Sequence, residues 1–243
     1  MTKLTILLLL TTACLSFAPA AGAVESPYDA TSRYEPRRVE GWKLLVNKRL
    51  LDDEQAALRD RTLRLLGDQL YQITRVVPAE ALGKLRKIPI WVELEERHHP
   101  CMCYHPDAKW LREHGMNPEK AGAVEVANAR NFNSWTLQQP WMVLHELAHG
   151  YHHQVLGFDN AEVRACFDAA VSAKLYDSVL NGRGSKVRHY ALNNDREYFA
   201  EMTEAYFGTN DFYPFVRAEL KQVDPRMYEL IEKVWGVRKV AAK

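Results

Sequence analysis

The clearest alternation of apolar and polar positions lies in residues 52–77. Apolar side chains recur there every three or four residues, which is the spacing of one face of an α-helix. This stripe consists of Leu58, Leu63, Leu66, Leu70, Ile73 and Val77. Pro78 follows and is expected to end the helix, because proline has no backbone N–H to donate. We therefore predict a long amphipathic helix that forms part of the core.

Three shorter stretches predict β-strands in the first half of the chain. Residues 39–46 alternate between apolar and polar side chains, while residues 88–94 and 123–129 are short apolar runs. Residues 24–38 are polar, and we predict a flexible N-terminal segment there. Residues 95–117 are rich in His, Cys and Pro, which predicts a connection that holds one short helix near Trp110.

The second half of the chain reads as a series of helices. Pro140 suits the first turn of a helix through residue 156, which Gly157 is placed to end. Asn160 and Asn194 are side chains that cap helix N-termini well, so each predicts the start of another helix. The helix after Asn194 should reach residue 207, and two more should follow as far as residue 235.

This order, with strands and one long helix before a run of helices, predicts an α+β fold. The chain after residue 23 has about 220 residues, which is the size of one domain. We therefore predict one domain over residues 39–243, with a mixed α/β lobe at 39–134 and a helical lobe at 135–243. The functional cleft should lie between the two lobes.

The N-terminus has the features of an export signal over residues 1–23. Lys3 precedes an apolar run, and Ala21-Gly22-Ala23 offers small residues for cleavage. The run is too short for a stable membrane span, so we expect a secreted or periplasmic protein. Lipid attachment at Cys14 is an alternative, which the threonine three residues earlier disfavours.

Charge excludes one class of partner. The chain has 32 Lys and Arg against 31 Asp and Glu, so no overall positive field draws it to polyanions. We therefore expect no nucleic-acid partner. Composition leaves the oligomeric state open.

Three cysteines remain after the predicted signal, namely Cys101, Cys103 and Cys166. In an oxidising compartment the simplest arrangement is one disulfide and one unpaired thiol, and we predict that the disulfide involves Cys166. A second zinc or copper site is the alternative for part of this set, because two of the cysteines lie among histidines. That cluster is His98, His99, Cys101, Cys103 and His105.

The segment His145-Glu146-Leu147-Ala148-His149 predicts a zinc site. Two histidines four residues apart on a helix lie nearly one above the other, so both imidazoles can bind one ion. A catalytic zinc site keeps three protein ligands and one water. Glu146 lies beside the first ligand and would accept the proton of that water, then pass it to the leaving amine. A purely structural zinc would need a fourth protein ligand instead, so Glu146 argues against a non-catalytic binding module.

The third ligand does not follow the metzincin pattern. That pattern requires a glycine and a histidine at the positions of His152 and Val155. His153 is two turns from His145, about 12 Å along the axis, which is too far to share one ion. We therefore expect His152 and His153 to lie on the helix surface or to line the cleft.

A glutamate on a later helix is the other solution. Glu197, Glu201 and Glu204 are spaced four and three residues apart, so all three share one helix face. Spacing alone does not choose among them. Glu197 also fits a capping box with Asn194, which would give it a purely local role.

A family resemblance makes the choice more specific. The run Glu-Tyr-Phe-Ala-Glu at residues 197–201 follows the histidine motif by about fifty residues, and Tyr190 stands seven residues before it. This arrangement resembles the protease domain of the anthrax lethal factor family. The resemblance covers roughly residues 135–208 and implies a two-lobed, zincin-like fold of the gluzincin type.

The resemblance also implies roles for individual residues. His145, His149 and Glu197 would bind Zn²⁺, and Glu146 would be the catalytic base. Tyr190 would donate a hydrogen bond to the oxyanion or the leaving group, and Glu201 would orient one of the ligands. The implied reaction is hydrolysis of peptide bonds by a zinc endopeptidase. Hydrolysis of a cell-wall peptide crosslink by the same chemistry is an alternative.

Gluzincins bind a peptide or protein substrate along an edge strand that precedes the zinc helix. Residues 124–132 are in this place, and Asn128-Ala129 is similar to the Asn-Ala edge strand of thermolysin-like enzymes. We therefore expect Asn128 and Ala129 to contact substrate. Such strand addition would recognise the peptide backbone more than its side chains.

Overall fold

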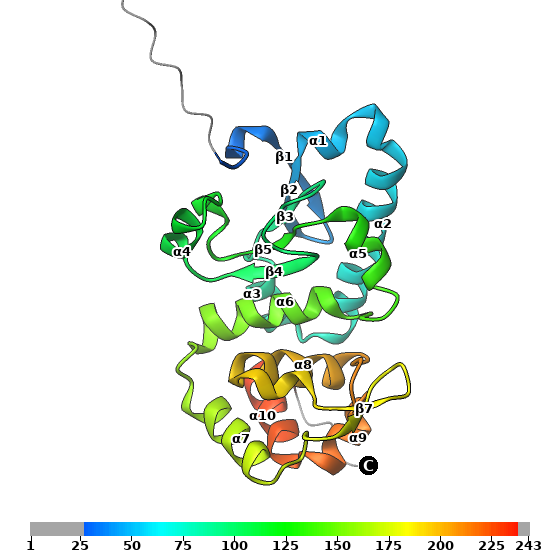
Figure 1. The fold of residues 1–243 in the computed structure, drawn as a ribbon. Helices are drawn as coiled ribbons and strands as arrows, with labels where there is room; N and C mark the ends of the chain where they lie inside the picture. Colours follow the sequence, from blue (N-terminus) through cyan, green and yellow to red (C-terminus); the bar gives the residue numbers. More distant parts are fainter. Residues whose placement is uncertain (1–26, 238–243) are drawn as a thin grey trace, which may run out of the picture.

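The structure is a computed structural model that describes residues 27–237. The predicted export signal and Cys14 lie outside the described residues. The fold is α+β, as predicted, with a five-stranded mixed sheet in the upper lobe and helices in the lower lobe (Figure 1). Within the described part of the chain, no helix is long and apolar enough to cross a membrane.

The sheet has the strand order β1-β2-β3-β5-β4. Strands β1 and β2 form an antiparallel hairpin, β2, β3 and β5 run parallel, and β4 is antiparallel to β5. Strands β1 and β4 are therefore the two edges. The strands are β1 (Tyr34–Val39), β2 (Trp42–Asn47), β3 (Ile90–Val92), β4 (Met102–His105) and β5 (Ala123–Val126).

The N-terminal region is more ordered than predicted. Residues 34–38 belong to β1, whereas we predicted a flexible segment through residue 38 and a strand only from residue 39. Only Tyr34 of β1 is buried, so its sequence has little apolar alternation. Backbone pairing with β2, from Tyr34 opposite Asn47 to Val39 opposite Trp42, makes it a strand.

The sequence did not predict two further elements that precede the histidine motif, strand β4 and helix α5 (Ala129–Trp135). The segment predicted as a connection contains β4 besides the short helix α4 (Ala108–Glu113). The strand predicted to reach residue 129 ends at Val126, and Asn128 instead caps α5 by accepting from Asn131 N. Since β5 lies between β3 and β4, the prediction of an edge strand at residues 124–132 is wrong.

The long amphipathic helix is confirmed. Helix α2 spans Ala56–Val76 and buries Leu66, Leu70 and Ile73 of the predicted stripe. It contacts α5 and α6, so it joins the sheet lobe to the histidine helix. The two other helices of this lobe are α1 (Lys48–Leu51) and α3 (Ala79–Leu85).

The helical half agrees closely with the predicted pattern. Gly157, with a φ of 83°, ends the histidine helix after a π-helical turn, and the side chains of Asn160 and Asn194 cap the next two N-termini. A small hairpin of β6 (Val179–Leu180) and β7 (Lys186–Val187) interrupts the series. The helices are α6 (Met142–Tyr151), α7 (Ala161–Ser172), α8 (Asp195–Phe207), α9 (Arg217–Val223) and α10 (Pro225–Trp235).

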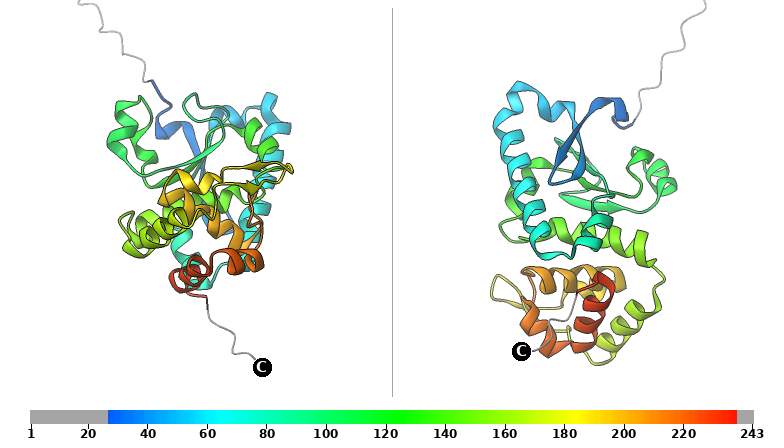
Figure 2. Two further views of the ribbon diagram at one scale, coloured as in Figure 1. Left: turned by 60° about the horizontal axis from the view of Figure 1, so that its bottom comes forward. Right: turned by 180° about the vertical axis from the view of Figure 1, so that it is seen from behind.

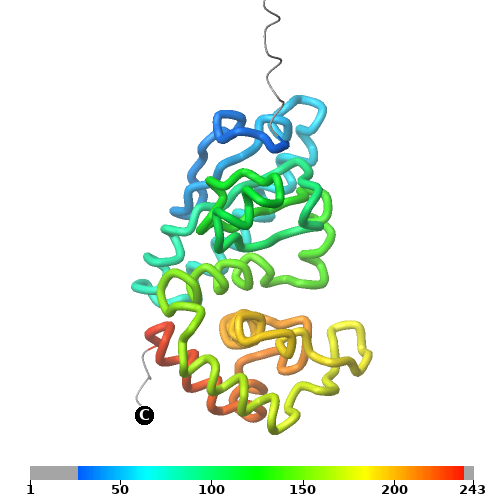
Figure 3. Tube along the Cα trace, turned by 60° about the vertical axis from the view of Figure 1, so that its left-hand side comes forward, coloured from blue at the N-terminus to red at the C-terminus, as the bar shows by residue number. Residues whose placement is uncertain are grey.

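The two lobes meet where α6 and α8 pack together. Helix α6 runs along the lower border of the sheet, and α8 lies directly beneath it, as Figure 1 and the side view of Figure 3 show. Figure 2 shows the same division from behind, with α7, α9 and α10 below. Gly208, at the end of α8, permits this approach, because a Cβ there would lie 2.1 Å from ring atoms of Trp141.

The predicted disulfide is not formed. Cys101, Cys103 and Cys166 are all free thiols. The first two lie at or beside β4 in the sheet lobe, while Cys166 is on α7 in the helical lobe. The fold therefore separates Cys166 from the other two cysteines, which sequence spacing alone could not reveal.

Candidate metal centre

Helix α6 presents both motif histidines on one face. The ring centroids of His145 and His149 are 4.7 Å apart, as a spacing of four residues predicts. The rest of the helix is anchored in the core, where Val143 and Leu147 are fully buried. The histidine positions are therefore fixed by packing against β4 and β5 on one side and α8 on the other.

Helix α8 brings Glu197 to these histidines. Its Oε2 lies 3.1 Å from His145 Nε2 and 3.2 Å from His149 Nε2. Asn194 caps the helix by accepting from Glu197 N, so the capping prediction holds for Asn194. The Glu197 carboxylate, however, is directed at the two rings. Of the three glutamates on this face, Glu197 is the one that contacts both histidines.

The three side chains fit a metal ion. Their ligand atoms all lie within 4.8 Å of one another. Tetrahedral ligands with bonds of about 2.0–2.1 Å lie about 3.3 Å apart, close to the two N···O distances of this site. Two imidazoles and one carboxylate are also a donor set of catalytic zinc sites. His145, His149 and Glu197 are therefore the residues that could hold zinc.

A second glutamate of α8 holds the far side of the His145 ring. Glu204 Oε1 lies 2.7 Å from His145 Nδ1, whereas Glu201 Oε1 is 3.7 Å from the same atom. We predicted Glu201 as the orienting residue, and the structure gives this contact to Glu204. The reason is that the ring lies across α8, so glutamates two turns apart on one face reach its two nitrogens from opposite sides.

Glu201 has a different environment. Its side chain is 5% exposed, and Oε2 has no hydrogen-bond partner although it lies 3.9 Å from His189 Nδ1. Burial, and then the neighbouring charge of Glu204, raise the pKa of Glu201 well above its usual range. The protonated carboxyl is therefore favoured beside Glu204, which limits the negative charge behind the metal centre.

The metal-free centre holds protons tightly. Burial lowers the pKa of His145, but contacts with Glu197 and Glu204 raise it more, so the net pKa is well above the usual value. Burial raises the pKa of Glu197, and its contacts with His145 and His149 then lower it far below the usual range. A metal ion would have to displace the proton on His145, so metal affinity should fall as the pH falls.

Glu146 stays outside this network. Among the residues that the structure describes, it has no hydrogen bond or ion pair, yet it lines the same cleft. Burial raises the pKa of Glu146, while the charges of His145 and His149 lower it by less. A carboxylate with a raised pKa and no fixed partner can accept and return a proton near neutral pH.

Tyr190 enters the cleft from the short 3₁₀ turn Tyr190–Asn193 that precedes α8. Its ring centroid is 6.5 Å from that of His145, and the side chain is 46% exposed. It is therefore not a buried core residue, and its hydroxyl can reach a molecule bound in the cleft. Burial of part of the ring and the nearby Glu197 raise the pKa of Tyr190, so its hydroxyl remains a proton donor at neutral pH.

The cleft has a volume of about 600 Å³ and two different walls. The helical wall is formed by α6 and α8 and carries the metal-binding set. The strand wall is formed by the edge strand β4 and the residues before it, including Cys101, Met102, Cys103 and Tyr104. A free strand edge therefore faces the metal centre.

Two other sequence predictions are wrong. Ala129 is fully buried and Asn128 caps α5, so neither belongs to an edge strand. His152 is fully buried between Phe158 and Phe199, not on the surface. His153 is partly exposed, in agreement with the prediction, and its Nδ1 lies 2.8 Å from the Tyr104 hydroxyl oxygen.

Sequence reasoning missed Glu204, Asp211 and the cleft-lining strand β4. Asp211 lines the cleft, and burial followed by the charge of Glu204 raises its pKa to about 6. Glu204 lies on the same helix face as Glu197, and this spacing could have revealed that Glu204 also reaches His145. No local pattern marks Asp211, which comes from the loop after α8.

The candidate donor set thus consists of two histidines on α6 and a glutamate on α8. Comparison with known families matches residues 78–234 to anthrax toxin lethal factor, N- and C-terminal domain. This match covers more than half of the chain, so the protein belongs to the lethal factor family, which is associated with zinc metalloproteases. No curated protein and no solved structure matched the chain.

Proposed function

We propose that this protein is a zinc-dependent peptidase that hydrolyses peptide bonds in the cleft between its lobes. The observation that carries the proposal is the convergence of His145, His149 and Glu197, with Glu146 alongside and without a fixed partner. Membership of the lethal factor family supports the same chemistry. The proposal includes export from the cytoplasm, as the N-terminal sequence predicts.

Each residue of the centre has a distinct task. Zinc bound there would supply a Lewis acid that activates water and polarises the scissile carbonyl. Glu146 accepts a proton from the attacking water and delivers it to the leaving amine. Tyr190 donates a hydrogen bond to the oxygen on which negative charge develops. Glu204 keeps His145 oriented, with Nε2 toward the centre.

The substrate backbone is proposed to pair with β4 instead of β5. Strand β4 pairs with β5 along one edge only, so its other edge has free backbone groups. Residues 101–104 line the cleft opposite the metal centre. An extended peptide added to this edge would place its carbonyls near Glu146, and it would be selected mainly by its backbone.

The experiment is the variant Glu146→Gln, tested on unfolded casein with zinc content measured in parallel. We expect full zinc occupancy and a loss of turnover of about 10²–10⁴-fold, because the amide cannot accept the proton. Glu162→Gln is a matched control, since Glu162 is exposed on α7, and its activity should be unchanged. Retained activity in Glu146→Gln, or wild-type protein that binds zinc and cleaves no peptide, would refute the proposal.

A further inference from the structure

The strand wall contains a second group of metal-binding side chains. Ligand atoms of His99, Cys103 and His105 all lie within 4.8 Å of one another. Cys103 and His105 are two residues apart on β4, so they share one face of the sheet. Cys103 Sγ lies 3.4 Å from His105 Nε2, and the rings of His99 and His105 are 5.3 Å apart. His99 and Cys103 also line the cleft, so an ion can reach them from solvent.

One atom of this group lacks a partner. His99 Nε2 is buried and makes no hydrogen bond with the described residues. A buried polar atom without a partner is destabilising. The ring that carries this atom lies within reach of two other potential ligands, Cys103 and His105. A metal ion among the three side chains would satisfy it.

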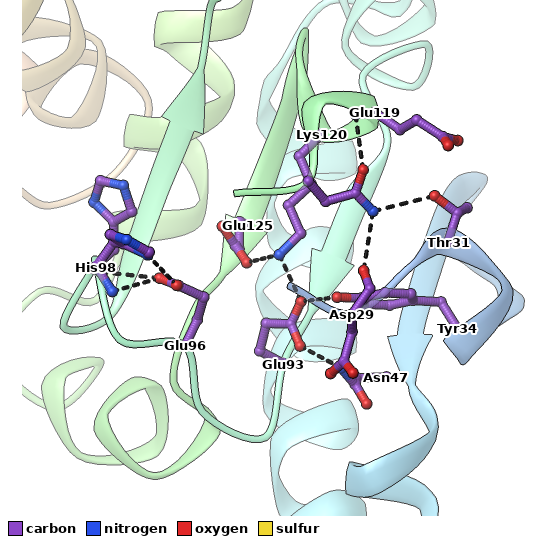
Figure 4. A network of polar contacts seen from close by, with 12 residues as sticks. Asp29, Thr31, Tyr34, Asn47, Glu93, Glu96, His98, Glu119, Lys120 and Glu125 are labelled. Atoms are coloured by element: carbon purple, nitrogen blue, oxygen red, sulfur yellow. Dashed lines mark hydrogen bonds and ion pairs between the residues drawn. The ribbon is translucent and has the colours of Figure 1, made fainter. Parts of the chain in front are cut away.

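The group is also held in place. The Glu96 carboxylate accepts hydrogen bonds from the backbone N–H of His98 and, at 3.3 Å, of His99, which fixes the loop before β4 (Figure 4). Glu125 Oε2 lies 2.6 Å from His105 Nε2 and fixes that ring. Cys103 Sγ approaches the same nitrogen, so an ion bound there would replace this hydrogen bond and would lie beside the Glu125 carboxylate.

A carboxylate lies directly beside His105. Lys120 forms ion pairs with both Glu93 and Glu125, and all three side chains are almost fully buried (Figure 4). Glu125 also contacts His105 Nε2 at 2.6 Å, so a cation bound at this end of the group would lie next to a negatively charged partner.

We propose that His99, Cys103 and His105 bind a second zinc ion in the strand wall of the cleft. Thiolate and imidazole are ligands that zinc prefers, with bonds of about 2.0–2.3 Å that place tetrahedral ligands about 3.3–3.8 Å apart. The ligand atoms lie within 4.8 Å of one another, so binding would draw them closer together. Three protein ligands leave one position open toward the cleft. The inference does not depend on peptidase activity, because its ligands are separate from those on α6 and α8.

Cobalt titration of the reduced, metal-stripped full-length protein tests the proposal. Co²⁺ bound to a thiolate gives a near-ultraviolet charge-transfer band, and the centre on α6 and α8 contains no sulfur. We expect wild type to bind two equivalents with this band. The double variant His145→Ala, His149→Ala should bind one equivalent and keep the band. Cys103→Ser should lose the band and bind one equivalent.

Two further variants keep the test decisive. Cys166→Ser removes a thiol on α7 and should leave both the band and the stoichiometry unchanged. His99→Ala changes a partly exposed loop residue and should weaken the band-forming site without affecting the fold. If wild type shows no thiolate band, or if the band persists in Cys103→Ser, the proposal is overturned. A single equivalent of metal in wild type would also overturn it.

Discussion

The two walls of the cleft hold buried carboxylates for different purposes. On the helical wall, Glu197 and Glu204 are directed at the two nitrogens of His145, and no lysine or arginine within residues 27–237 forms an ion pair with them. On the side of the strand wall, Glu93 and Glu125 are paired with Lys120 inside the sheet lobe, behind the residues that line the cleft. The first arrangement fits a metal ion, whereas the second is largely completed by the chain itself.

This difference separates function from stability. Removing a carboxylate from the helical wall should reduce metal binding while the fold survives, because the site gains its last partner from outside. Removing Lys120 from the strand wall should leave two buried negative charges and therefore reduce stability. The following predictions test that division.

The largest effect should come from Glu197→Ala. Glu197 would bind the ion directly, and among residues 27–237 it is the only carboxylate that contacts both histidines, so stoichiometric zinc binding at neutral pH should disappear. Peptidase activity should fall by more than the about 10²–10⁴-fold expected from loss of the base alone. Zinc content and melting temperature should be measured together. Full zinc occupancy with a lower melting temperature would mean that Glu197 is only a capping residue.

Lys120→Met should reduce the free energy of unfolding by about 3–5 kcal/mol, because it leaves Glu93 and Glu125 buried without their cation. Urea denaturation measures this. Lys84→Met is the matched control, since Lys84 forms an exposed ion pair with Glu80 and its loss should change stability little. Equal effects of the two variants would contradict the division between the walls.

Glu204→Ala should weaken zinc affinity by about 10–100-fold, because His145 loses the carboxylate that orients its ring. Glu201→Ala should have a smaller effect, since Glu201 is 3.7 Å from the same nitrogen and its protonated form is favoured. Competition with a chromogenic chelator gives both affinities. A larger loss in Glu201→Ala would restore the role that the sequence predicted for Glu201.

The smallest effect concerns Asp211 in metal-free protein. Its pKa is raised from 3.8 to about 6 by burial and by Glu204, so the folded state disfavours the ionised form. The free energy of unfolding should therefore fall as the pH rises through this interval. Asp211→Asn should be more stable than wild type at pH 8, by about 1–2 kcal/mol after allowance for partial exposure.

At pH values below the ordinary carboxyl pKa, wild type and Asp211→Asn should have the same stability, because Asp211 is then protonated in both folded and unfolded chains. Added zinc should reduce the difference at pH 8, since a cation near Glu204 lowers the penalty. Urea unfolding at several pH values with a chelator checks this. A difference that is independent of pH would contradict the role of Asp211 ionisation.

Local sequence determined much of the helical half. Spacing and capping residues placed α2, α6, α7 and α8 correctly, because helix signals lie within a few residues of one another. The same locality predicted that His145 and His149 would share a face. Resemblance to a family then selected Glu197, which the structure places against both rings.

Tertiary structure alone decided the features that depend on contacts between distant segments. Strand β1 exists through pairing with β2, and the edge position of β4 follows from sheet order. Glu204 became the partner of His145 because α8 packs across α6. Cys166 stayed apart from Cys101 and Cys103 because the lobes separate them. The periodicity of a sequence shows which face of a helix or strand is buried. The element that packs against this face is decided only by the tertiary structure.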